Sequence, residues 1–468
     1  MASAGAAVLR SGGNAVDAAL AAVLHSFTAE PLLTGLGAGG YLLVAGPGRA
    51  PVLLDFFVAA PAAAPAASLV EVDVSFGDAS QAFNVGAASC GVWGTPAGIV
   101  AAAERYGTVP LADLCAPAVA LARDGLIVNA QQAYLLDILV PIVHSSAEAR
   151  AHFEPAGRRL RVGDRYRDPA LGDALERLGR EGAAPFYSGD VGRAVCAWVG
   201  ERGGALSEAD LVAYEAIERE PVSAAFQGRE VLTNPPPSAG GILIAYALAL
   251  LERGHGLVEA MEAAQAERTA EFVQGLGEPG FLDAFMASRL GSTTHIAVLD
   301  RSGLACSVTC TNGEGSGMVV PGTGMHVNNV MGEEDLSPLG YFTHPPGSRM
   351  PSMMAPTIVL GADGVPELAL GSAGSNRIRS AIVQVVANVL GDGLPLREAV
   401  DAPRLHFEAG RVYVEPGVDE SALAGRELAR FRERSLFFGG VQAVRRDPAG
   451  GGLAGAADPR RGGAVAVA

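Results

Sequence analysis

The chain has 468 residues, of which 49% are hydrophobic and 18% charged, and its formal net charge is −16. This length and composition indicate a large globular protein and exclude a disordered chain. Because the charge is acidic and no basic run occurs, neither nucleic acid nor an anionic membrane surface is an expected partner.

Three residue types exclude further chemistry. The sequence has no lysine, which removes Schiff-base catalysis, a phosphate-loop lysine and a Ser-Lys dyad. Its five cysteines are odd in number and lack CxxC spacing, so we expect buried, reduced thiols. The eight histidines show no metal-ligand spacing, and we expect no metal site.

The beginning of the chain does not predict a membrane segment. The apolar stretch 15–45 is interrupted by Asp17, His25 and Glu30, so it is not expected to span a bilayer. Residues 1–10 lack the basic region of a secretory signal, and cytoplasmic residence is the default expectation. A trimmed N-terminus, with a leader lost, stays an open alternative.

The N-terminal part predicts one helix and two strands. Helical composition covers 4–25. A glycine-rich stretch at 35–40 precedes an apolar strand at 41–45, and a second strand is expected at 52–58. A dinucleotide-binding fingerprint needs a helix after its glycines. We therefore interpret these glycines as allowing the backbone to pass close to a ligand or another strand.

The middle of the chain predicts mainly helices. They are expected just after 92–98 and at 110–124, 242–252 and 257–275. Ser207 suits the N-cap of another helix, because acidic residues follow it in the first turn. The proline-rich turn 234–241 enters the apolar helix, while 126–205 indicates only surface helices and loops.

Residues 292–317 predict a β-hairpin that brings two threonines together. Apolar residues alternate on both sides of the turn-forming stretch 300–303. Thr293 then lies at the mouth of the first strand, and the second strand returns Thr311 to it. A threonine that becomes a chain terminus can use its own amine, whose pKa is about 8, as general base. The alternative is a buried hairpin that merely begins with two threonines.

A second turn of small residues precedes a helix near the C-terminus. Residues 371–378 lead into an apolar helix expected at 378–390. Backbone N–H groups at such a turn are unpaired and can bind an anion. Gly374 and Ser375 occupy this turn.

These motifs together resemble the γ-glutamyltransferase family over nearly the whole chain and in the family's order. The resemblance rests on residues 12–19, 92–98, 207–211, 234–241, 293–295, 311–317, 328–329, 349–357, 371–378, 402–406 and 458–463. It implies an α+β, four-layer αββα N-terminal nucleophile hydrolase fold. It also implies self-cleavage between Ser292 and Thr293 into a large subunit, 1–292, and a small subunit, 293–468.

The resemblance assigns the catalytic roles without any cofactor. Thr293 would first cut its own chain and then attack the substrate amide, with its freed amine as base. Thr311 would orient the Thr293 hydroxyl. The N–H groups of Gly374 and Ser375 would form the oxyanion hole.

The expected substrate clamp departs from the family's pattern. Where relatives place an arginine that binds the substrate α-carboxylate, this chain has Phe57, which cannot replace a guanidinium fork. Asn312, Glu333 and Ser352 stay as predicted substrate-binding residues, although Val330 replaces a binding glutamine and only one of two adjacent serines remains. Arg349 is a hypothetical substitute anion binder; the alternative is a solvated surface arginine.

The resemblance implies a zymogen that becomes an amide hydrolase or acyltransferase. It would cleave γ-glutamyl amides such as glutathione through a threonyl acyl-enzyme, with water or an amine as acceptor. Because Phe57 weakens the glutamate clamp, an acylase or amidase acting on another acyl group is the first alternative. A non-catalytic relative used as a binding protein is the second. A homo-oligomer of processed heterodimers is conceivable.

Overall fold

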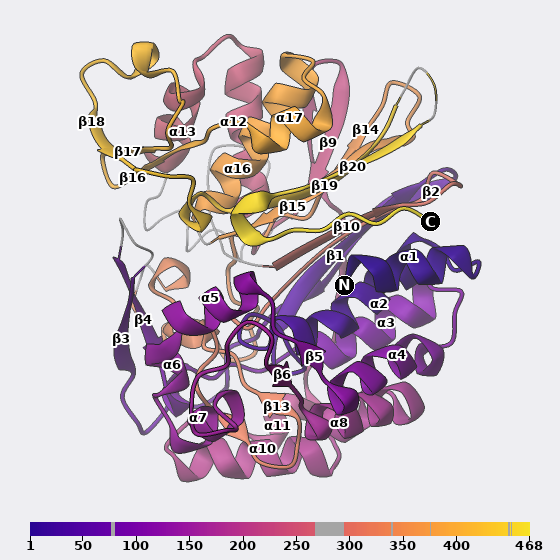
Figure 1. Ribbon diagram of the computed structural model, residues 1–468, viewed down its shortest axis with the longest axis vertical. Coiled ribbons are helices and arrows are strands. Elements are labelled where there is room, and N and C mark those ends of the chain that lie inside the picture. Colours follow the sequence, from indigo (N-terminus) through magenta and orange to yellow (C-terminus); the bar gives the residue numbers. More distant parts are fainter. Residues whose placement is uncertain (76–79, 267–293, 338–339, 375, 448–449, 451) are drawn as a thin grey trace.

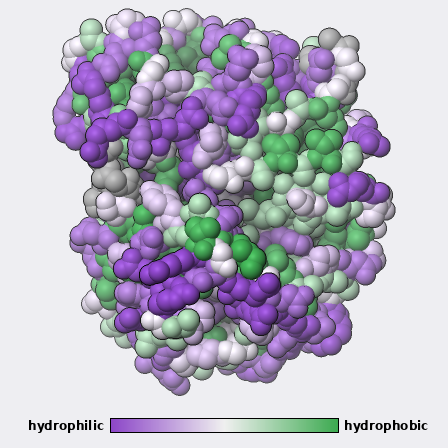
Figure 2. All heavy atoms as spheres, viewed as in Figure 1, coloured by the Kyte–Doolittle hydropathy of each residue, from purple (hydrophilic) through white to green (hydrophobic). Residues whose placement is uncertain are grey.

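The computed structural model describes residues 1–75, 80–266, 294–337, 340–374, 376–447, 450 and 452–468. Two β-sheets lie face to face in the middle of the molecule, and helices cover the outer face of each (Figure 1). The expected α+β, four-layer αββα arrangement is therefore present. On the face drawn in Figure 2, hydrophilic residues cover most of the upper left and lower parts, whereas hydrophobic residues gather at mid-height.

The first sheet contains the predicted hairpin. Its antiparallel strands lie in the order β10 (Thr294–Leu299), β11 (Ala305–Thr311), β1 (Gly39–Gly46), β2 (Arg49–Phe56) and β7 (Ile217–Arg219). The strands expected at 41–45 and 52–58 are confirmed as β1 and β2, with shifted ends. Alternate side chains of β1 bury opposite faces: Leu42 belongs to the core under the helices, and Leu43 to the core between the sheets.

The second sheet is formed mainly by the C-terminal part of the chain. Its antiparallel strands lie in the order β20 (Leu453–Ala457), β19 (Gly440–Arg446), β15 (Pro366–Ala373), β14 (Thr357–Leu360), β9 (Arg229–Thr233) and β8 (Val222–Phe226). Ile358 and Ala369 from this sheet meet Tyr41 and Leu43 from the first in a shared apolar core. The two halves of the sequence are thereby packed into one structure.

Five helices form the layer over the first sheet. They are α1 (Ala2–Arg10), α2 (Ala15–Ala29), α3 (Thr95–Tyr106), α4 (Leu111–Asp124) and α8 (Pro169–Glu181). The helices expected after 92–98 and at 110–124 are confirmed. The single helix expected at 4–25 is wrong. Gly12 has a φ of +95°, which ends α1, and Asn14 starts α2 in a capping box with Asp17.

Among the residues that the structure describes, four helices form the layer over the second sheet. They are α12 (Gly240–Glu252), α13 (Leu257–Ala266), α16 (Arg377–Val386) and α17 (Leu396–Asp401). The helix expected at 242–252 is confirmed, and the one expected at 378–390 continues past α16 as a π-helical turn at Ala387–Gly391. The helix expected at 257–275 is confirmed as far as Ala266, and its remainder lies outside the described residues.

Short elements surround this framework. The expected surface helices of 126–205 include α5 (Ala130–Ile138), α6 (Val140–Val143), α7 (Ala147–Phe153), α9 (Ala184–Tyr187) and α10 (Asp190–Glu201). Ser207 caps α11 (Glu208–Val212) as predicted. Small sheets that were not predicted pair β3 (Val70–Ser75) with β4 (Ser80–Val85), β5 (Leu126–Ile127) with β6 (Arg165–Tyr166), β12 (Val319–Val320) with β13 (Met325–His326), and β16 (Leu405–Glu408) with β17 (Arg411–Val414) and β18 (Glu427–Arg430).

Two expectations drawn from composition can be compared with the structure. All five cysteines are buried and unpaired, as expected. Among the described helices, none combines the length and apolarity needed to cross a bilayer.

Candidate active site

The hairpin brings the start of β10 beside the end of β11. Thr294 opens β10 and pairs with Cys310, and Thr311 follows as the last residue of β11. The predicted nucleophile Thr293, and with it the predicted cleavage site after Ser292, lies outside the described residues. The described site is therefore built on the residues next to Thr293.

The glycine-rich loop 313–317, called the glycine loop below, follows β11 and fixes the side chain of Thr311. The buried Thr311 hydroxyl accepts the N–H of Gly313 at 2.9 Å. The N–H groups of Glu314 and Gly315 both donate to the Asn329 side-chain oxygen, at 3.0 and 3.2 Å. Gly313 has a φ of +66°, and a Cβ there would lie 2.0 Å from that oxygen, so the loop requires glycine. Asn329 thus sets the loop that orients Thr311.

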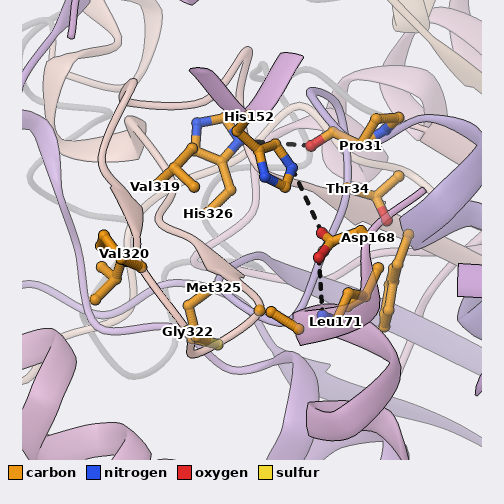
Figure 3. Close-up of a pocket in the computed structure, with 15 residues that line it drawn as sticks. Pro31, Thr34, His152, Asp168, Leu171, Val319, Val320, Gly322, Met325 and His326 are labelled. Carbon is orange, nitrogen blue, oxygen red and sulfur yellow. Dashed lines mark hydrogen bonds and ion pairs between the residues drawn. The ribbon is translucent and has the colours of Figure 1, made fainter. Parts of the chain in front are cut away.

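The buried residue His326 forms a hydrogen bond to this loop. The Gly317 N–H donates to His326 Nε2 at 3.2 Å, and His326 Nδ1 lies 3.4 Å from the Pro31 carbonyl oxygen (Figure 3). One ring nitrogen therefore accepts while the other donates, which defines a neutral imidazole. Burial lowers the pKa of His326 to about 4, so the ring is neutral at neutral pH.

The pocket beside His326 shows no metal-binding character. Figure 3 shows His152 and Asp168 on its wall, with the His152 Nε2 atom 3.4 Å from a carboxylate oxygen of Asp168. The other Asp168 oxygen accepts the Leu171 N–H at the start of α8. No cluster of His, Cys, Asp and Glu in the described ranges could hold a metal ion. The pocket's polar groups thus bond to the surrounding protein.

A different pocket joins two predicted catalytic residues, Thr311 and Gly374, with the neighbour of Thr293 in the sequence. Thr294, Thr311 and Gly374 all line it. Gly374 directly follows β15 with a φ of +129°, and a Cβ there would lie 2.8 Å from the Gly439 backbone, so this position also requires glycine. Ser375, the second predicted oxyanion donor, lies outside the described residues.

The remaining walls of this pocket are of two kinds. The apolar wall consists of Leu33, Phe83, Leu135, Ile138, Leu139 and Leu436. The charged side chains on the pocket are Glu314, Arg377 and Arg461. The pocket therefore presents both an apolar and a charged surface beside Thr294, which follows the predicted nucleophile in the sequence.

Two predicted substrate-binding residues adjoin the glycine loop. Asn312 is buried; its N–H donates to the Leu33 carbonyl at 2.8 Å, and its side-chain amide donates to the His326 carbonyl at 3.3 Å. A carboxylate oxygen of Glu333 lies 2.6 Å from where a Cβ of Gly313 would be. Both residues are close to Thr311, and their roles in binding substrate stay predictions.

The predicted carboxylate clamp lies in a closed cluster away from this pocket. Phe57 is 1% exposed and stacks on Tyr41, with 5.5 Å between ring centroids. The Arg349 side chain is 6% exposed, lies 3.4 Å from Asp55 and stacks over Tyr214. The interpretation of Arg349 as a solvated surface arginine is therefore wrong. The described residues that line the Thr311 pocket do not include Phe57 or Arg349.

Ser352 secures the proline-rich turn 234–241. Its hydroxyl accepts the Met354 N–H at 3.0 Å, and its carbonyl accepts the N–H groups of Ala239 and Gly240. The side chain is buried, and its hydroxyl already has a structural partner. Its predicted role in binding substrate remains a prediction.

Four charged residues of the site were not predicted as site residues from the sequence: Glu30, Glu314, Arg377 and Arg461. The Thr294 hydroxyl lies 3.4 Å from a carboxylate oxygen of Glu30, at the end of α2, and burial raises the pKa of Glu30. Arg461 reaches the pocket from the short helical turn η7 (Pro459–Arg461). The sequence around Arg461 contributed to the resemblance, but no spacing in it indicates a contact with the hairpin.

Two stacked sheets between helices, with threonines at a strand end, define the N-terminal nucleophile hydrolase class of fold. Comparison with known sequences then gives the family. The family profile described as gamma-glutamyltranspeptidase matches residues 1–284 and 281–468. The chain therefore belongs to the gamma-glutamyltranspeptidase family.

Individual relatives carry two kinds of name. The glutathione hydrolase proenzyme of Escherichia coli (strain K12) is 32% identical, over 97% of this chain and 88% of that protein. The acylase ACY 1 proenzyme of Pseudomonas sp. (strain SE83) is 30% identical, over 96% of this chain and 88% of that protein. The crystal structure of cephalosporin acylase from Bacillus halodurans superimposes with a TM-score of 0.85 and 26% identity, covering 100% of this chain and 94% of that one.

These comparisons show an enzyme of a family that acts on small-molecule amides. They favour catalysis over the alternative of a non-catalytic binding protein. Because glutathione hydrolases and acylases both occur among the relatives, they leave the acyl group open.

Proposed function

We propose that this chain is a self-processing amide hydrolase or acyltransferase with Thr293 as its nucleophile. The observation that supports this most strongly is the convergence of Thr294, Thr311 and Gly374 on one pocket. A nucleophile next to Thr294 would have an orienting hydroxyl and a backbone oxyanion donor within the same cavity.

Maturation would produce the free amine that catalysis needs. The Thr293 hydroxyl attacks the Ser292 carbonyl carbon, the peptide C–N bond breaks, and the hydroxyl proton passes to the released Thr293 amine. Water then hydrolyses the resulting ester, which leaves a carboxylate on Ser292 and restores the hydroxyl. The products are the large subunit, 1–292, and the small subunit, 293–468.

Turnover would use the same oxygen again. The Thr293 amine takes the hydroxyl proton as the oxygen attacks the substrate amide, and the N–H groups of Gly374 and Ser375 stabilise the oxyanion. The amide C–N bond breaks, the leaving amine takes the proton, and an acyl-enzyme remains. Water or an amine then accepts the acyl group. The Thr311 hydroxyl, held by the glycine loop, orients the nucleophile.

The acyl group has two candidates. A γ-glutamyl amide such as glutathione follows from the names of several relatives. A different acyl amide is favoured by the closed cluster, because Phe57 supplies no positive charge and Arg349 is already beside Asp55. Each lost charge-assisted hydrogen bond would weaken γ-glutamyl binding by about 1.5–3 kcal/mol.

A denaturing gel and a set of acyl donors test the proposal. Purified protein should give two bands near the sizes of 1–292 and 293–468, whereas Thr293→Ala should stay uncut and inactive. A cleaved Thr293→Ala protein, or activity in an uncut chain, would contradict the assigned role of Thr293. Rates with γ-glutamyl-4-nitroanilide and butyryl-4-nitroanilide then distinguish the two acyl groups.

A further inference from the structure

Two arginines stand together on the charged wall of the Thr311 pocket. Arg461 comes from η7, and Arg377 begins α16 directly after the Gly374 turn. A terminal nitrogen of Arg461 lies 3.1 Å from the place where a Cβ of Gly374 would be. Arg461 is therefore close to the predicted oxyanion donor, on the rim of the space a substrate would fill.

The two guanidinium groups differ in how they are satisfied. Arg377 donates to the Phe437 carbonyl at 3.0 Å, lies 3.5 Å from Gln81 Oε1 and stacks over the Phe437 ring. Arg461 Nε is buried without a hydrogen-bond partner, and no ion pair between described residues includes Arg461. Burial and the neighbouring Arg377 lower the pKa of Arg461 to about 10, so it is still charged at neutral pH. Arg461 is thus a cation without a pairing anion in the described protein.

Arg461 also stands where two cavities meet. It lines the Thr311 pocket and, together with Thr294, a larger groove that runs beside β10. Glu30 lies on that groove and Glu314 on the pocket, and both favour the charged form of Arg461 electrostatically. A ligand in either cavity can therefore lie beside both Arg461 and Thr294.

An unpaired buried cation beside an apolar wall matches one ligand chemistry. A guanidinium presents a planar fork of N–H donors that fits a carboxylate. Leu33, Leu139 and Leu436, on the same pocket, can bury an alkyl or aryl group without a polar cost. The two walls together suit an amide that has an apolar body and an anionic end.

We propose that Arg461 is the specificity-determining residue that binds a carboxylate of the amide substrate, which places the substrate among anionic amides with an apolar body. This inference rests on the proposed function, because it assigns a substrate class to the same pocket. The carboxylate belongs either to the acyl group or to the amine that leaves, and both sources offer the same chemistry to Arg461.

Matched substrates with and without the charge test the assignment. For the acyl side, glutaryl-4-nitroanilide is compared with its neutral methyl ester. For the amine side, N-butyryl-4-aminobenzoate is compared with N-butyrylaniline. In the processed wild-type enzyme, kcat/KM for one charged member should exceed that of its neutral partner about tenfold or more. The pair that shows the preference identifies which part of the substrate carries the carboxylate.

Three variants connect the preference to Arg461. Arg461→Gln should reduce the charged-to-neutral ratio of kcat/KM by about 10- to 100-fold, mainly through KM. Arg461→Lys should keep part of the preference, because it retains the charge without the fork. Arg397→Gln removes a surface arginine that pairs with Asp401 and should leave the ratio unchanged. An unchanged ratio in Arg461→Gln would overturn the assignment, as would an equal fall in kcat for charged and neutral substrates, which indicates oxyanion stabilisation instead.

A binding measurement separates this inference from the proposed function. Calorimetry with glutarate and with 4-aminobenzoate is performed on the wild-type protein and Arg461→Gln, whether or not the chains are cut. Binding that Arg461→Gln loses, with no turnover of any amide, supports the assignment and refutes the proposed function. Turnover with Arg461-independent selectivity supports the proposed function and refutes the assignment. Neither binding nor turnover refutes both.

Discussion

The Thr311 pocket and the cluster around Asp55 differ in whether their buried charges form ion pairs. In the cluster, the fully buried Asp55 carboxylate pairs with Arg219 at 2.8 Å and lies 3.4 Å from Arg349. In the pocket, Arg461 makes no ion pair with another described residue, and its Nε has no hydrogen-bond partner. Buried charges that pair internally hold elements together, whereas an unpaired one is available to a ligand.

Because of this difference, the protein could still bind an anion although Phe57 stands where relatives have the arginine of the carboxylate clamp. The Phe57 N–H donates to Asp55, so the backbone at the clamp position serves the cluster too. A substrate carboxylate would have to displace Asp55 before it reached Arg349, and the two negative charges would repel each other. Arg461 makes no ion pair with a described residue that a substrate carboxylate would have to displace, although Glu30 and Glu314 act on its charge from a distance. We therefore expect the anion to bind at Arg461 in the Thr311 pocket rather than at Arg349 in the cluster around Asp55.

The largest effect should follow from closing the pocket at Gly374. In Gly374→Ala, the new Cβ would meet the Gly439 backbone at 2.8 Å and Arg461 at 3.1 Å, with a φ of +129° that alanine rarely adopts. The turn would shift, and we expect kcat to fall about 100- to 1,000-fold, the usual loss for one oxyanion donor. Steady-state kinetics with the best amide substrate measure this fall.

The matched control lies at the other end of the same strand. Gly364, in the turn between β14 and β15, has a φ of +73°, but no described atom lies within 4 Å of where its Cβ would be. Gly364→Ala should therefore cost some stability, about 1 kcal/mol, but leave kcat unchanged. Equal losses of kcat in the two variants would show that backbone strain, rather than the pocket, causes the effect.

The next largest effect is a fall in the free energy of unfolding when the cluster around Asp55 loses its negative charge. Asp55→Asn removes the negative charge and leaves Arg349 buried without an ionic partner, so the free energy of unfolding should fall by about 3 kcal/mol. Arg461→Gln breaks no described ion pair, and we expect its free energy of unfolding to stay within about 1 kcal/mol of wild type. Chemical denaturation of both variants measures the contrast. A larger loss in Arg461→Gln than in Asp55→Asn would reverse the comparison.

The sequence predicts the backbone of the Thr311 pocket better than it predicts the cluster around Asp55. The β10–β11 hairpin and the small-residue turn at Gly374 follow from alternation and turn chemistry, which are local properties. Residues of both line one pocket. The break between α1 and α2 was missed because a glycine inside a helical composition is often tolerated, whereas here Gly12 takes a positive φ.

The surroundings of the charged groups could not be predicted. Arg349 was expected either at a substrate or in solvent, yet its side chain is buried against Asp55 and Tyr214, residues far away in the sequence. Arg461 and Glu30 come from opposite ends of the chain, and only the packing of η7 and α2 near β10 brings them to the site. Ion pairing of this kind depends on tertiary distances that no local pattern encodes.

The smallest expected effect is a loss of stability at low pH, which should arise because His326 supports the glycine loop. Burial lowers the pKa of His326 to about 4, whereas in the unfolded chain it is about 6.5, so below pH 6.5 the unfolded state binds a proton more readily. The stabilisation from neutral His326 is thus fully present above pH 6.5 and is lost as the pH falls toward 4. Between pH 7 and pH 5 the loss should be about 2 kcal/mol.

His326→Gln isolates this term, because glutamine can accept the Gly317 N–H but does not titrate. Denaturation of both proteins at pH 7 and pH 5 gives two differences, and the one for wild type should exceed the one for His326→Gln by about 2 kcal/mol. The other buried histidines, His295 among them, titrate in both proteins and cancel in this comparison. Equal differences would mean that the loop is not held through a neutral His326, and its other contacts, among them those to Asn329, would then orient Thr311.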